Sequence, residues 1–573
     1  MQIFRKKFLS MHSQNKIRLT ELYLDKVSKI ENEINDTTTY KYEDLKFYFS
    51  GINYKYPEKM IFHISIPQKL LGLKTKSLNN ISIEHYLLKY LGKVINDFNI
   101  DNLNKHKDIR ERPYIEAQET NEVIISRNGI KFDKCNNSFI LNLFFQFPLI
   151  NNHSIIAKTT FKFIKTILDI VYNECIDFYE KYEIKTLHSI YVRQQFIRKY
   201  LKKNGYISFI ANGSILPRID GTTKPNNDAI KFISPIENEI QIVFQDGFKI
   251  KGMGIKKGII VITGGGYSGK STLLDSIQFG IYNHEAGDGR EFCITDESAI
   301  KIVTEDGRSI SNLNLSAFFK YIGNESCVKN FSTDHASGSV SQAANIIEGI
   351  NASCKLMLFD EDKSATNFMI KDDIMRRIIL DEAIIPFIDR IKEIYERFNI
   401  SFILVIGASS DYIKYATGVF LMKKYILKNI TSICKNIEFS NLSINHKRGQ
   451  FKQIRAISPV INMEFIYFKF VKNENSKYVH IGEYKANITY LTSIISDYQV
   501  NYLVSIIKFI LSKKEYYGKD LYSILKHNFN YLSSEIIDEY LIDSNSDKIL
   551  WLEETKLNEI FLTINRLRGL IIK

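Results

Sequence analysis

The sequence predicts an α/β fold in the middle third of the chain, and three observations predict it. Short β-branched runs bounded by Gly or Asp are typical of buried parallel strands. Such runs occupy Gly258–Thr263, Lys355–Phe359 and Phe402–Ile406. Segments of helical length alternate with them, at Lys270–Tyr282, Ser337–Asn351 and Asp372–Phe398. A glycine-rich loop directly follows the first run, as expected where a strand turns into a helix.

The two flanks of this core have their own patterns. Upstream, we expect helices at Ile17–Ile34, Ile155–Tyr182 and Ile190–Asn204, and strands at Glu122–Ser126 and Phe139–Phe147. The Gly- and Pro-rich segment Ala211–Pro235 predicts a boundary. Downstream, Val500–Leu511 and Leu557–Leu567 predict helices. We therefore expect an α+β domain at residues 1–235, the α/β core at 236–425 and a mixed C-terminal domain at 426–573.

The positive charge lies outside the core. The chain has a net charge of +13, of which residues 1–250 carry +10, residues 251–425 carry −2 and residues 426–573 carry +5. Basic flanks favour an anionic partner such as RNA or DNA. The chain is also rich in Lys, Asn, Ile and Tyr, so biased base composition of the coding DNA is a competing explanation of the same charge.

No apolar run reaches the roughly 18–20 residues that a membrane span needs, so we expect no membrane partner. The six cysteines lie far apart without a C-x-x-C pair, which indicates neither a zinc site nor a disulfide framework. A cytoplasmic location is expected. The basic stretch before Glu21 is also compatible with a mitochondrial or other organellar transit peptide.

The segment from Gly264 to Ser271 fits the phosphate-loop pattern G-x-x-x-x-G-K-[ST]. Glycines let successive backbone N–H groups converge on a phosphate, and the following helix N-terminus adds partial positive charge. Lys270 is expected to reach the β- and γ-phosphates of ATP, and the Ser271 hydroxyl to bind Mg²⁺. The predicted nucleotide-binding residues are Gly264, Gly265, Gly266, Tyr267, Ser268, Gly269, Lys270, Ser271 and Thr272.

Two carboxylates end the predicted strand that begins at Lys355. At the carboxyl end of this strand, Asp360 is expected to hold Mg²⁺ and Glu361 to polarise the attacking water as general base. We expect this strand to neighbour the strand of the phosphate loop.

A Ser/Gly turn at Ala336–Gln342 opens a predicted helix between these two motifs. Its residues and its spacing from the other motifs resemble the signature motif of ABC-type ATPases, and Ser364–Asn367 resembles their D-loop. The chain as a whole resembles the family of soluble predicted ATPases of the ABC class, from about residue 40 to the C-terminus. Further runs that carry the resemblance are Asn212–Arg218, Tyr282–Glu291, Asp360–Met369 and Asn565–Leu570.

The resemblance implies an ABC nucleotide-binding domain that is not a transporter subunit. It also implies that Ser337, Gly338, Ser339 and Gln342 contact the γ-phosphate bound by a second protomer, so that ATP joins a homodimer. The chain departs from the usual pattern in four places. Val340 replaces the usual Gln of the signature, with Gln342 two residues on, and no Gln lies between Gln278 and the signature to form a Q-loop. Ser339 replaces the second signature Gly, and Ser410 stands where a catalytic switch His is usual. These departures favour slow turnover.

Four other residues have two interpretations each. His284 and Asp288 either act near the nucleotide or stabilise a Gly-rich turn. Arg218 binds an anion or forms a structural salt bridge. Phe248 stacks on adenine or belongs to the core.

We expect a soluble ATPase that binds and hydrolyses Mg-ATP at a two-protomer interface and couples it to nucleic-acid binding or remodelling. The alternatives are a nucleotide-gated scaffold with negligible turnover and, less favoured, a P-loop kinase. A kinase has no use for the signature and D-loop segments.

Overall fold

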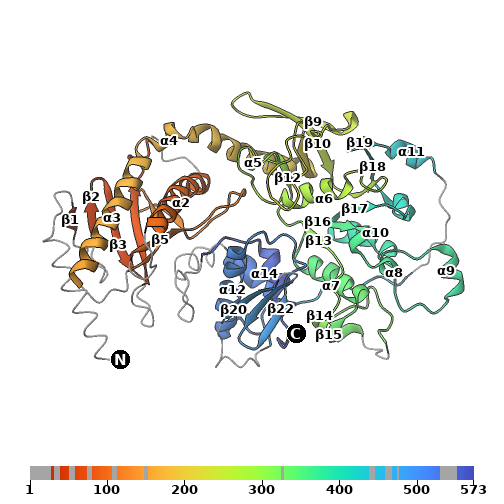
Figure 1. Cartoon of the computed structure of the whole chain (residues 1–573). Helices are drawn as coiled ribbons and strands as arrows, with labels where there is room; N and C mark the ends of the chain where they lie inside the picture. The colour runs from red at the N-terminus through yellow and green to blue at the C-terminus, as the bar shows by residue number, and fades with distance from the viewer. Residues whose placement is uncertain are drawn as a thin grey trace. The chain divides into compact units, whose positions relative to one another are not determined.

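The computed structural model describes residues 27–30, 39–50, 59–73, 80–105, 112–147, 153–323, 328–437, 446–458, 468–473, 476–529 and 551–572 (Figure 1). The chain forms two compact units. The first comprises residues 1–189 with 537–553, and the second comprises residues 190–536 with 554–573. The three-domain division expected from the sequence stays a prediction.

The first unit is built on an antiparallel sheet with the order β1-β2-β3-β4-β7-β5, in which β6 also pairs with β7. Its strands are β1 (Val27–Ile30), β2 (Thr39–Tyr42), β3 (Leu45–Ser50), β4 (Lys59–Pro67), β5 (Tyr114–Ala117), β6 (Ile130–Asp133) and β7 (Ser138–Gln146). Its helices are α2 (Asn80–Lys105), α3 (His153–Cys175) and α4 (Phe178–Lys181). Figure 1 shows α2 and α3 beside this sheet. The predicted strand Phe139–Phe147 is confirmed as β7.

The second unit contains the α/β core, a mixed sheet with the order β13-β16-β17-β11-β18-β19. Its strands are β11 (Ile259–Thr263), β13 (Ile300–Ile302), β16 (Leu356–Asp360), β17 (Ser401–Ile406), β18 (Gly418–Lys423) and β19 (Ile426–Asn429). All are parallel except β19, which pairs antiparallel with β18. The helices of this core are α6 (Lys270–Phe279), α7 (Gly338–Asn351), α8 (Thr366–Met369), α9 (Asp373–Ile378), α10 (Ile391–Phe398) and α11 (Thr431–Lys435). The predicted P-loop type of α/β fold is confirmed.

Smaller layers complete the second unit. An antiparallel sheet of order β12-β8-β10-β9 consists of β8 (Tyr206–Ala211), β9 (Glu239–Val243), β10 (Lys249–Lys256) and β12 (Cys293–Thr295). Strands β14 (Arg308–Leu313) and β15 (Phe331–Ala336) pair with each other. The C-terminal segment contributes β20 (Phe468–Asn473), β21 (Ser476–Ile481), β22 (Tyr484–Asn487), α12 (Asp497–Ser512) and α14 (Leu557–Ile564). Helix α5 (Ile184–Asn204) begins in the first unit and ends in the second.

Four predicted elements are wrong in whole or in part. Ile155–Tyr182 is not one helix, because Asp177 has left-handed backbone (φ 51°) and separates α3 from α4. Asp372–Phe398 is not one helix, because Pro386 lacks the N–H that a helix needs and disfavours helical backbone before it; α9 and α10 lie on either side of it. Glu122–Ser126 forms no strand. The side chains of Asn121 and Arg127 satisfy backbone groups there that a strand ladder would use. Within Ile17–Ile34, the described residues Val27–Ile30 are a strand paired with β2, and residues 17–26 and 31–34 lie outside the described parts.

Candidate nucleotide site

The phosphate loop joins the end of β11 to the start of α6. Gly264 and Gly269 have φ values of 151° and 100°, which side-chain-bearing residues rarely adopt. A Cβ at Gly264 would also lie 2.2 Å from the carbonyl oxygen of Met422. The loop therefore needs glycine at its first position for two separate reasons.

The loop has the shape and the donors for a phosphate group. A Cβ added at Gly265 or Gly266 would meet no atom within 4 Å, so the loop borders open space. The Lys270 ammonium lies over the loop and donates to the carbonyl oxygens of Gly264 at 2.7 Å and Gly265 at 2.8 Å. The N-terminus of α6 adds the partial positive charge that favours anions. These residues fit a bound nucleotide phosphate.

Asp360 lies at the same edge of the sheet as the loop. In register, Asp360 pairs with Val405 of β17, and Thr263 of β11 pairs with Ile406 of β17. Strand β17 therefore separates the two motifs, and the expectation that their strands are direct neighbours is wrong. Two strand spacings put the backbones about 10 Å apart, a gap that is closed only if side chains and ligand atoms reach across the end of β17.

Asp360 and Ser271 are placed differently with respect to solvent. Asp360 is buried, which raises the pKa of its carboxyl group, opposed in part by the positive charges of Lys301 and Lys363. Ser271 is exposed in the first turn of α6. A hydroxyl and a carboxylate oxygen are ligands that Mg²⁺ accepts alongside phosphate oxygens and water. The donor set therefore fits Mg²⁺ bound together with a nucleotide.

Glu361 reaches from the end of β16 over the end of β17. Its carboxylate accepts backbone N–H groups from Gly407, from Ala408 at 3.0 Å and from Ser409 at 3.2 Å. Ser410 follows these residues at the N-cap position of the short 3-10 helix Asp411–Tyr415, where its side chain makes no capping hydrogen bond. The structure thus brings Glu361 to the loop that contains Ser410, between the strands of Asp360 and of the phosphate loop.

The signature-like segment belongs to a different part of the second unit. Ser337 is the N-cap of α7, and its side chain makes no capping hydrogen bond. The Ser339 hydroxyl donates to Asn367 Oδ1 at 2.9 Å, and Gln342 Oε1 accepts the Ala365 N–H at 2.8 Å. The signature-like and D-loop-like segments are therefore joined to each other. Figure 1 shows α7 apart from α6, with β13 and β16 drawn between them.

The runs Asn212–Arg218 and Tyr282–Glu291 meet in one cluster of polar contacts, in which His284 and Asp288 are buried. Arg218 binds both carboxylate oxygens of Asp288, at 2.9 and 2.7 Å, and His284 Nδ1 lies 2.9 Å from the same carboxylate. Burial raises the pKa of Asp288, but His284 and Arg218 outweigh this effect and hold the pKa below its usual range. The arrangement favours the structural interpretation of Arg218. Phe248 is 39% exposed, and the Arg193 guanidinium lies 3.9 Å from its ring centroid.

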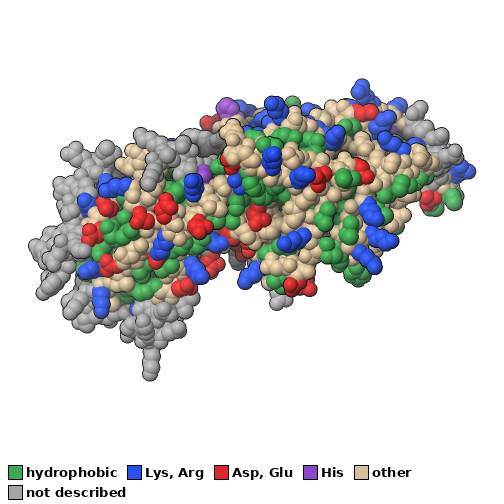
Figure 2. Space-filling model, turned by 90° about the horizontal axis from the view of Figure 1, so that it is seen from above, with side chains coloured by type: hydrophobic (Ala, Val, Ile, Leu, Met, Phe, Trp, Pro, Cys, Tyr) green, Lys and Arg blue, Asp and Glu red, His purple; other side chains and the backbone are tan. Residues whose placement is uncertain are grey.

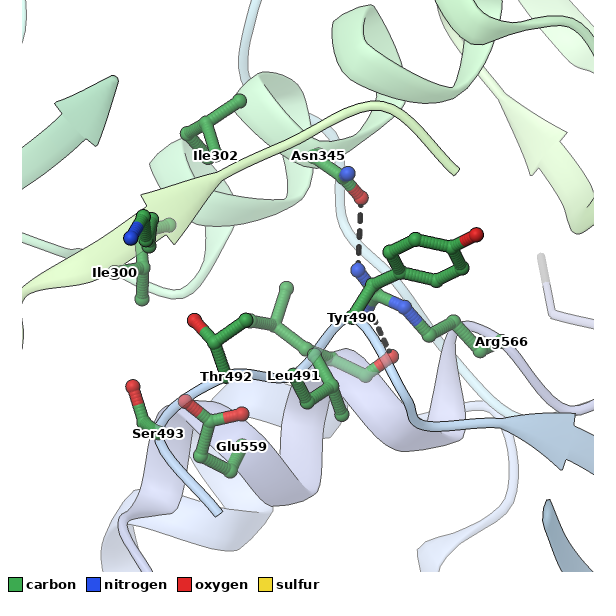
Figure 3. A pocket seen from close by; sticks show the side chains of 11 residues that line it. Ile300, Ile302, Asn345, Tyr490, Leu491, Thr492, Ser493, Glu559 and Arg566 are labelled. Atoms are coloured by element: carbon green, nitrogen blue, oxygen red, sulfur yellow. Dashed lines mark hydrogen bonds between the residues drawn. The ribbon is translucent and has the colours of Figure 1, made fainter. Parts of the chain in front are cut away.

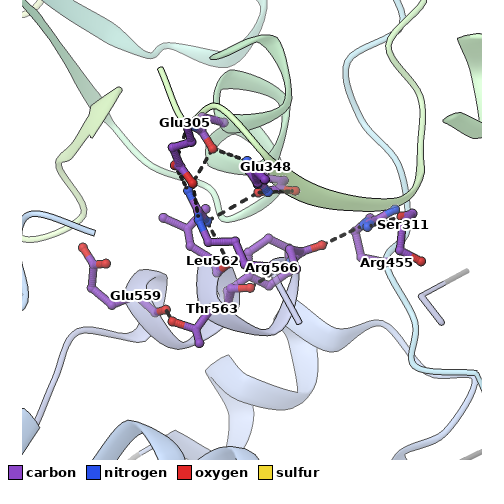
Figure 4. A network of polar contacts seen from close by, with 12 residues as sticks. Glu305, Ser311, Glu348, Arg455, Glu559, Leu562, Thr563 and Arg566 are labelled. Carbon is purple, nitrogen blue, oxygen red and sulfur yellow. Dashed lines mark hydrogen bonds and ion pairs between the residues drawn. The ribbon is translucent and has the colours of Figure 1, made fainter. Parts of the chain in front are cut away.

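Sequence reasoning missed a network of buried charges between α7 and the C-terminal segment (Figure 4). Arg566 pairs with Glu305, and Arg308 pairs with Glu348 of α7. Asn345 of α7 donates to Glu305 at 2.9 Å and accepts from Arg566 at 2.8 Å. The run Asn565–Leu570 carries part of the family resemblance, but the side-chain partners of Arg566 lie more than 200 residues away in the chain, where no local pattern indicates them.

In the described parts of the chain, no three His, Cys, Asp or Glu side chains gather as a metal site. None of the described helices combines the length and the apolarity that a bilayer crossing requires.

Comparisons with known proteins agree with this geometry. Residues 180–457 match the family model of ABC ATPases, described as a P-loop domain. An uncharacterized protein of Methanocaldococcus jannaschii, MJ1628, is 34% identical over 234 residues, which cover 38% of this chain and 50% of that protein. The chain thus spans about half the length of this curated relative.

Solved structures similar to part of the chain include two chains of ABC proteins. One is cbiO1 from Clostridium perfringens, part of the ABC transporter complex cbiONQ, at 15% identity, 39% of this chain, 87% of that chain and a TM-score of 0.23. Another is the ADP conformation of MJ1267, an ATP-binding cassette of an ABC transporter, at 13% identity, 40% of this chain, 94% of that chain and a TM-score of 0.24. The assignment of residues 180–457 as an ABC-type P-loop domain rests on the family match, together with the strand order and the phosphate loop.

Proposed function

We propose that this ABC-type P-loop domain binds Mg-ATP and hydrolyses it at an interface between two copies of the chain. One observation carries the proposal. The loop of Lys270, the carboxylate of Asp360 and the carboxylate of Glu361 lie along one edge of one sheet, at the carboxyl ends of β11 and β16, where α/β sheets bind their ligands.

Each residue has a separate task in this proposal. The loop N–H groups and Lys270 bind the phosphates, and Ser271 and Asp360 hold Mg²⁺, which neutralises phosphate charge. Glu361 accepts the proton of the attacking water. The backbone N–H groups that bind its carboxylate fix its orientation over the end of β17.

The position of α7 supports a site shared by two copies. Within one chain, the start of α7 lies apart from the phosphate loop (Figure 1). Because Ser337, Gly338 and Ser339 resemble the ABC signature motif, we expect them to contact nucleotide bound by the partner copy. The buried network of Figure 4 ties α7 to the C-terminal segment. Closure of the dimer would accordingly move that segment together with α7.

Binding of labelled ATP tests the phosphate site. Lys270→Ala removes the ammonium of the loop, and we expect it to abolish ATP binding while leaving the melting temperature unchanged. Lys257→Ala, at an exposed lysine before β11, is the matched control and should bind ATP like the wild type. ATP binding by Lys270→Ala as tight as that of the wild type would contradict the assignment.

A nucleic-acid partner is the second part of the proposal, supported by the net charge of +13. On the face seen in Figure 2, Lys and Arg side chains are interspersed with Asp and Glu and do not gather in one patch. Such a surface favours weak, sequence-independent binding over specific recognition. A nucleotide-gated scaffold with little turnover is the alternative, because Ser410 offers no imidazole at the switch position.

A further inference from the structure

The hairpin of β18 and β19 turns through two residues with left-handed backbone. Lys423 pairs with Ile426, which leaves Lys424 and Tyr425 as the turn. Their φ values are 49° and 64°. Two-residue hairpins of this kind prefer Asn and Gly, because a Cβ disfavours positive φ. A tyrosine here is costly to the hairpin, so it calls for an explanation outside the hairpin.

Tyr425 contacts the phosphate loop with both its backbone and its ring. The Tyr425 N–H donates to the carbonyl oxygen of Ser268 at 3.0 Å. The ring covers Gly269 so closely that a Cβ built on Gly269 would lie 2.7 Å from Tyr425 Cδ1. At the other end of the loop, Gly264 packs against the carbonyl group of Met422 in β18. The hairpin therefore holds the loop at its first and last glycines.

The bond to Ser268 sets the orientation of one peptide group of the loop. A trans peptide is planar, so its C=O and N–H point in opposite directions. When the Ser268 carbonyl is held toward Tyr425, the N–H of Gly269 must point away from the hairpin. Backbone N–H groups of a phosphate loop bind an anion only when they converge on it.

We propose that Tyr425 is a positioning residue that holds the phosphate loop in its anion-binding conformation. The proposal rests on the proposed binding of ATP by that loop. It assigns to the β18–β19 hairpin a role that the motifs of the loop itself do not include.

Glycine substitutions distinguish a role of Tyr425 in positioning the phosphate loop from a role in stabilising the fold. Tyr425→Gly and Lys424→Gly both relieve an unfavourable positive φ, so both should keep or raise the melting temperature. Tyr425→Gly keeps the backbone N–H that bonds to Ser268 and removes only the ring over Gly269. We expect it to weaken Mg-ATP binding by about tenfold or more, measured by calorimetry, because the ring no longer restrains the loop at Gly269. Lys424→Gly should bind within about twofold of the wild type. Asparagine also tolerates positive φ, so Tyr425→Asn should weaken Mg-ATP binding as Tyr425→Gly does.

Hydrogen exchange without nucleotide gives a readout that does not depend on ATP. The amides of the loop from Gly264 to Gly269 should exchange faster in Tyr425→Gly than in the wild type and in Lys424→Gly. Unchanged loop exchange in Tyr425→Gly, or equal acceleration in both glycine variants, would overturn the proposal. Failure of the wild type to bind ATP would instead overturn the proposed function, and the exchange measurement would still decide the role of Tyr425.

Discussion

Arg566 forms a buried ion pair with Glu305, 261 positions earlier in the chain, and its Nε lies 3.0 Å from Glu305 Oε2. Arg566 follows α14, and Glu305 lies between β13 and β14. Asn345 of α7 bonds to both side chains. The last helix of the chain is thus fixed to the helix that begins with the signature-like segment.

Arg566→Met should destabilise the protein by about 3–5 kcal/mol, because it leaves the buried carboxylate of Glu305 without its ion-pair partner. Urea unfolding followed by circular dichroism measures the change. Arg568→Met is the matched control two residues away, since the Arg568 side chain is 44% exposed, and it should cost less than about 1 kcal/mol. Equal losses of unfolding free energy in the two variants would contradict a special contribution of the Arg566–Glu305 ion pair to stability.

Glu559 of α14 should make stability depend on pH. It lines a small cavity with Ser493, Thr492 and Arg566 (Figure 3). Burial raises the pKa of Glu559 to about 7, opposed in part by Arg566, against an ordinary value of 4.5. The folded state therefore holds this proton more tightly than the unfolded state. The contribution of this proton to the free energy of unfolding is complete below pH 4.5. It is lost as the pH rises to about 7, a change of roughly 3 kcal/mol.

Glu559→Gln removes this titration. Relative to the wild type, the variant should gain roughly 2.5 kcal/mol of unfolding free energy between about pH 5 and about pH 8, in urea unfolding at both pH values. Glu515→Gln, at an exposed position after α12, should show no such difference. The expectation fails if Glu559→Gln and the wild type differ in free energy of unfolding by the same amount at both pH values.

Salt dependence should decide what the positive charge means. If the basic flanks bind nucleic acid, the log–log slope of affinity against salt should steepen by about −0.9 for each duplex phosphate neutralised, or about −0.7 for single strands. Fluorescence anisotropy with labelled RNA and DNA measures it. No binding to either at about 50 mM salt would leave coding bias as the better explanation.

The sequence predicted the nucleotide core well because its signals are local. The run from Ile259 to Ser271 contains a buried strand, the glycines of a turn and a helix start, and each follows from neighbouring residues. Helix α7 was predicted for the same reason, with Ser337 at its N-cap. A Ser/Gly turn before an apolar helix can be recognised from neighbouring residues alone, without knowledge of tertiary contacts.

Relationships across the sheet were not predictable in the same way. Strand order is a property of the packed sheet, so the insertion of β17 between β16 and β11 was missed. The contact of Tyr425 with Gly269 joins positions 156 residues apart, and positive φ at Lys424 and Tyr425 contradicts local preference. Tertiary contacts override local signals at such places.

The oligomeric state of Glu361→Gln tests the central proposal most directly. Gln keeps the shape of Glu361 but cannot accept a proton from water, so a closed dimer should accumulate with Mg-ATP. Light scattering should show a dimer with Mg-ATP and a monomer without nucleotide. Adding Ser337→Arg, which puts a bulky cation where the partner's phosphates would lie, should return the protein to monomer. A Glu361→Gln protein that stays monomeric at saturating Mg-ATP, or dimerises equally without it, would contradict the shared site.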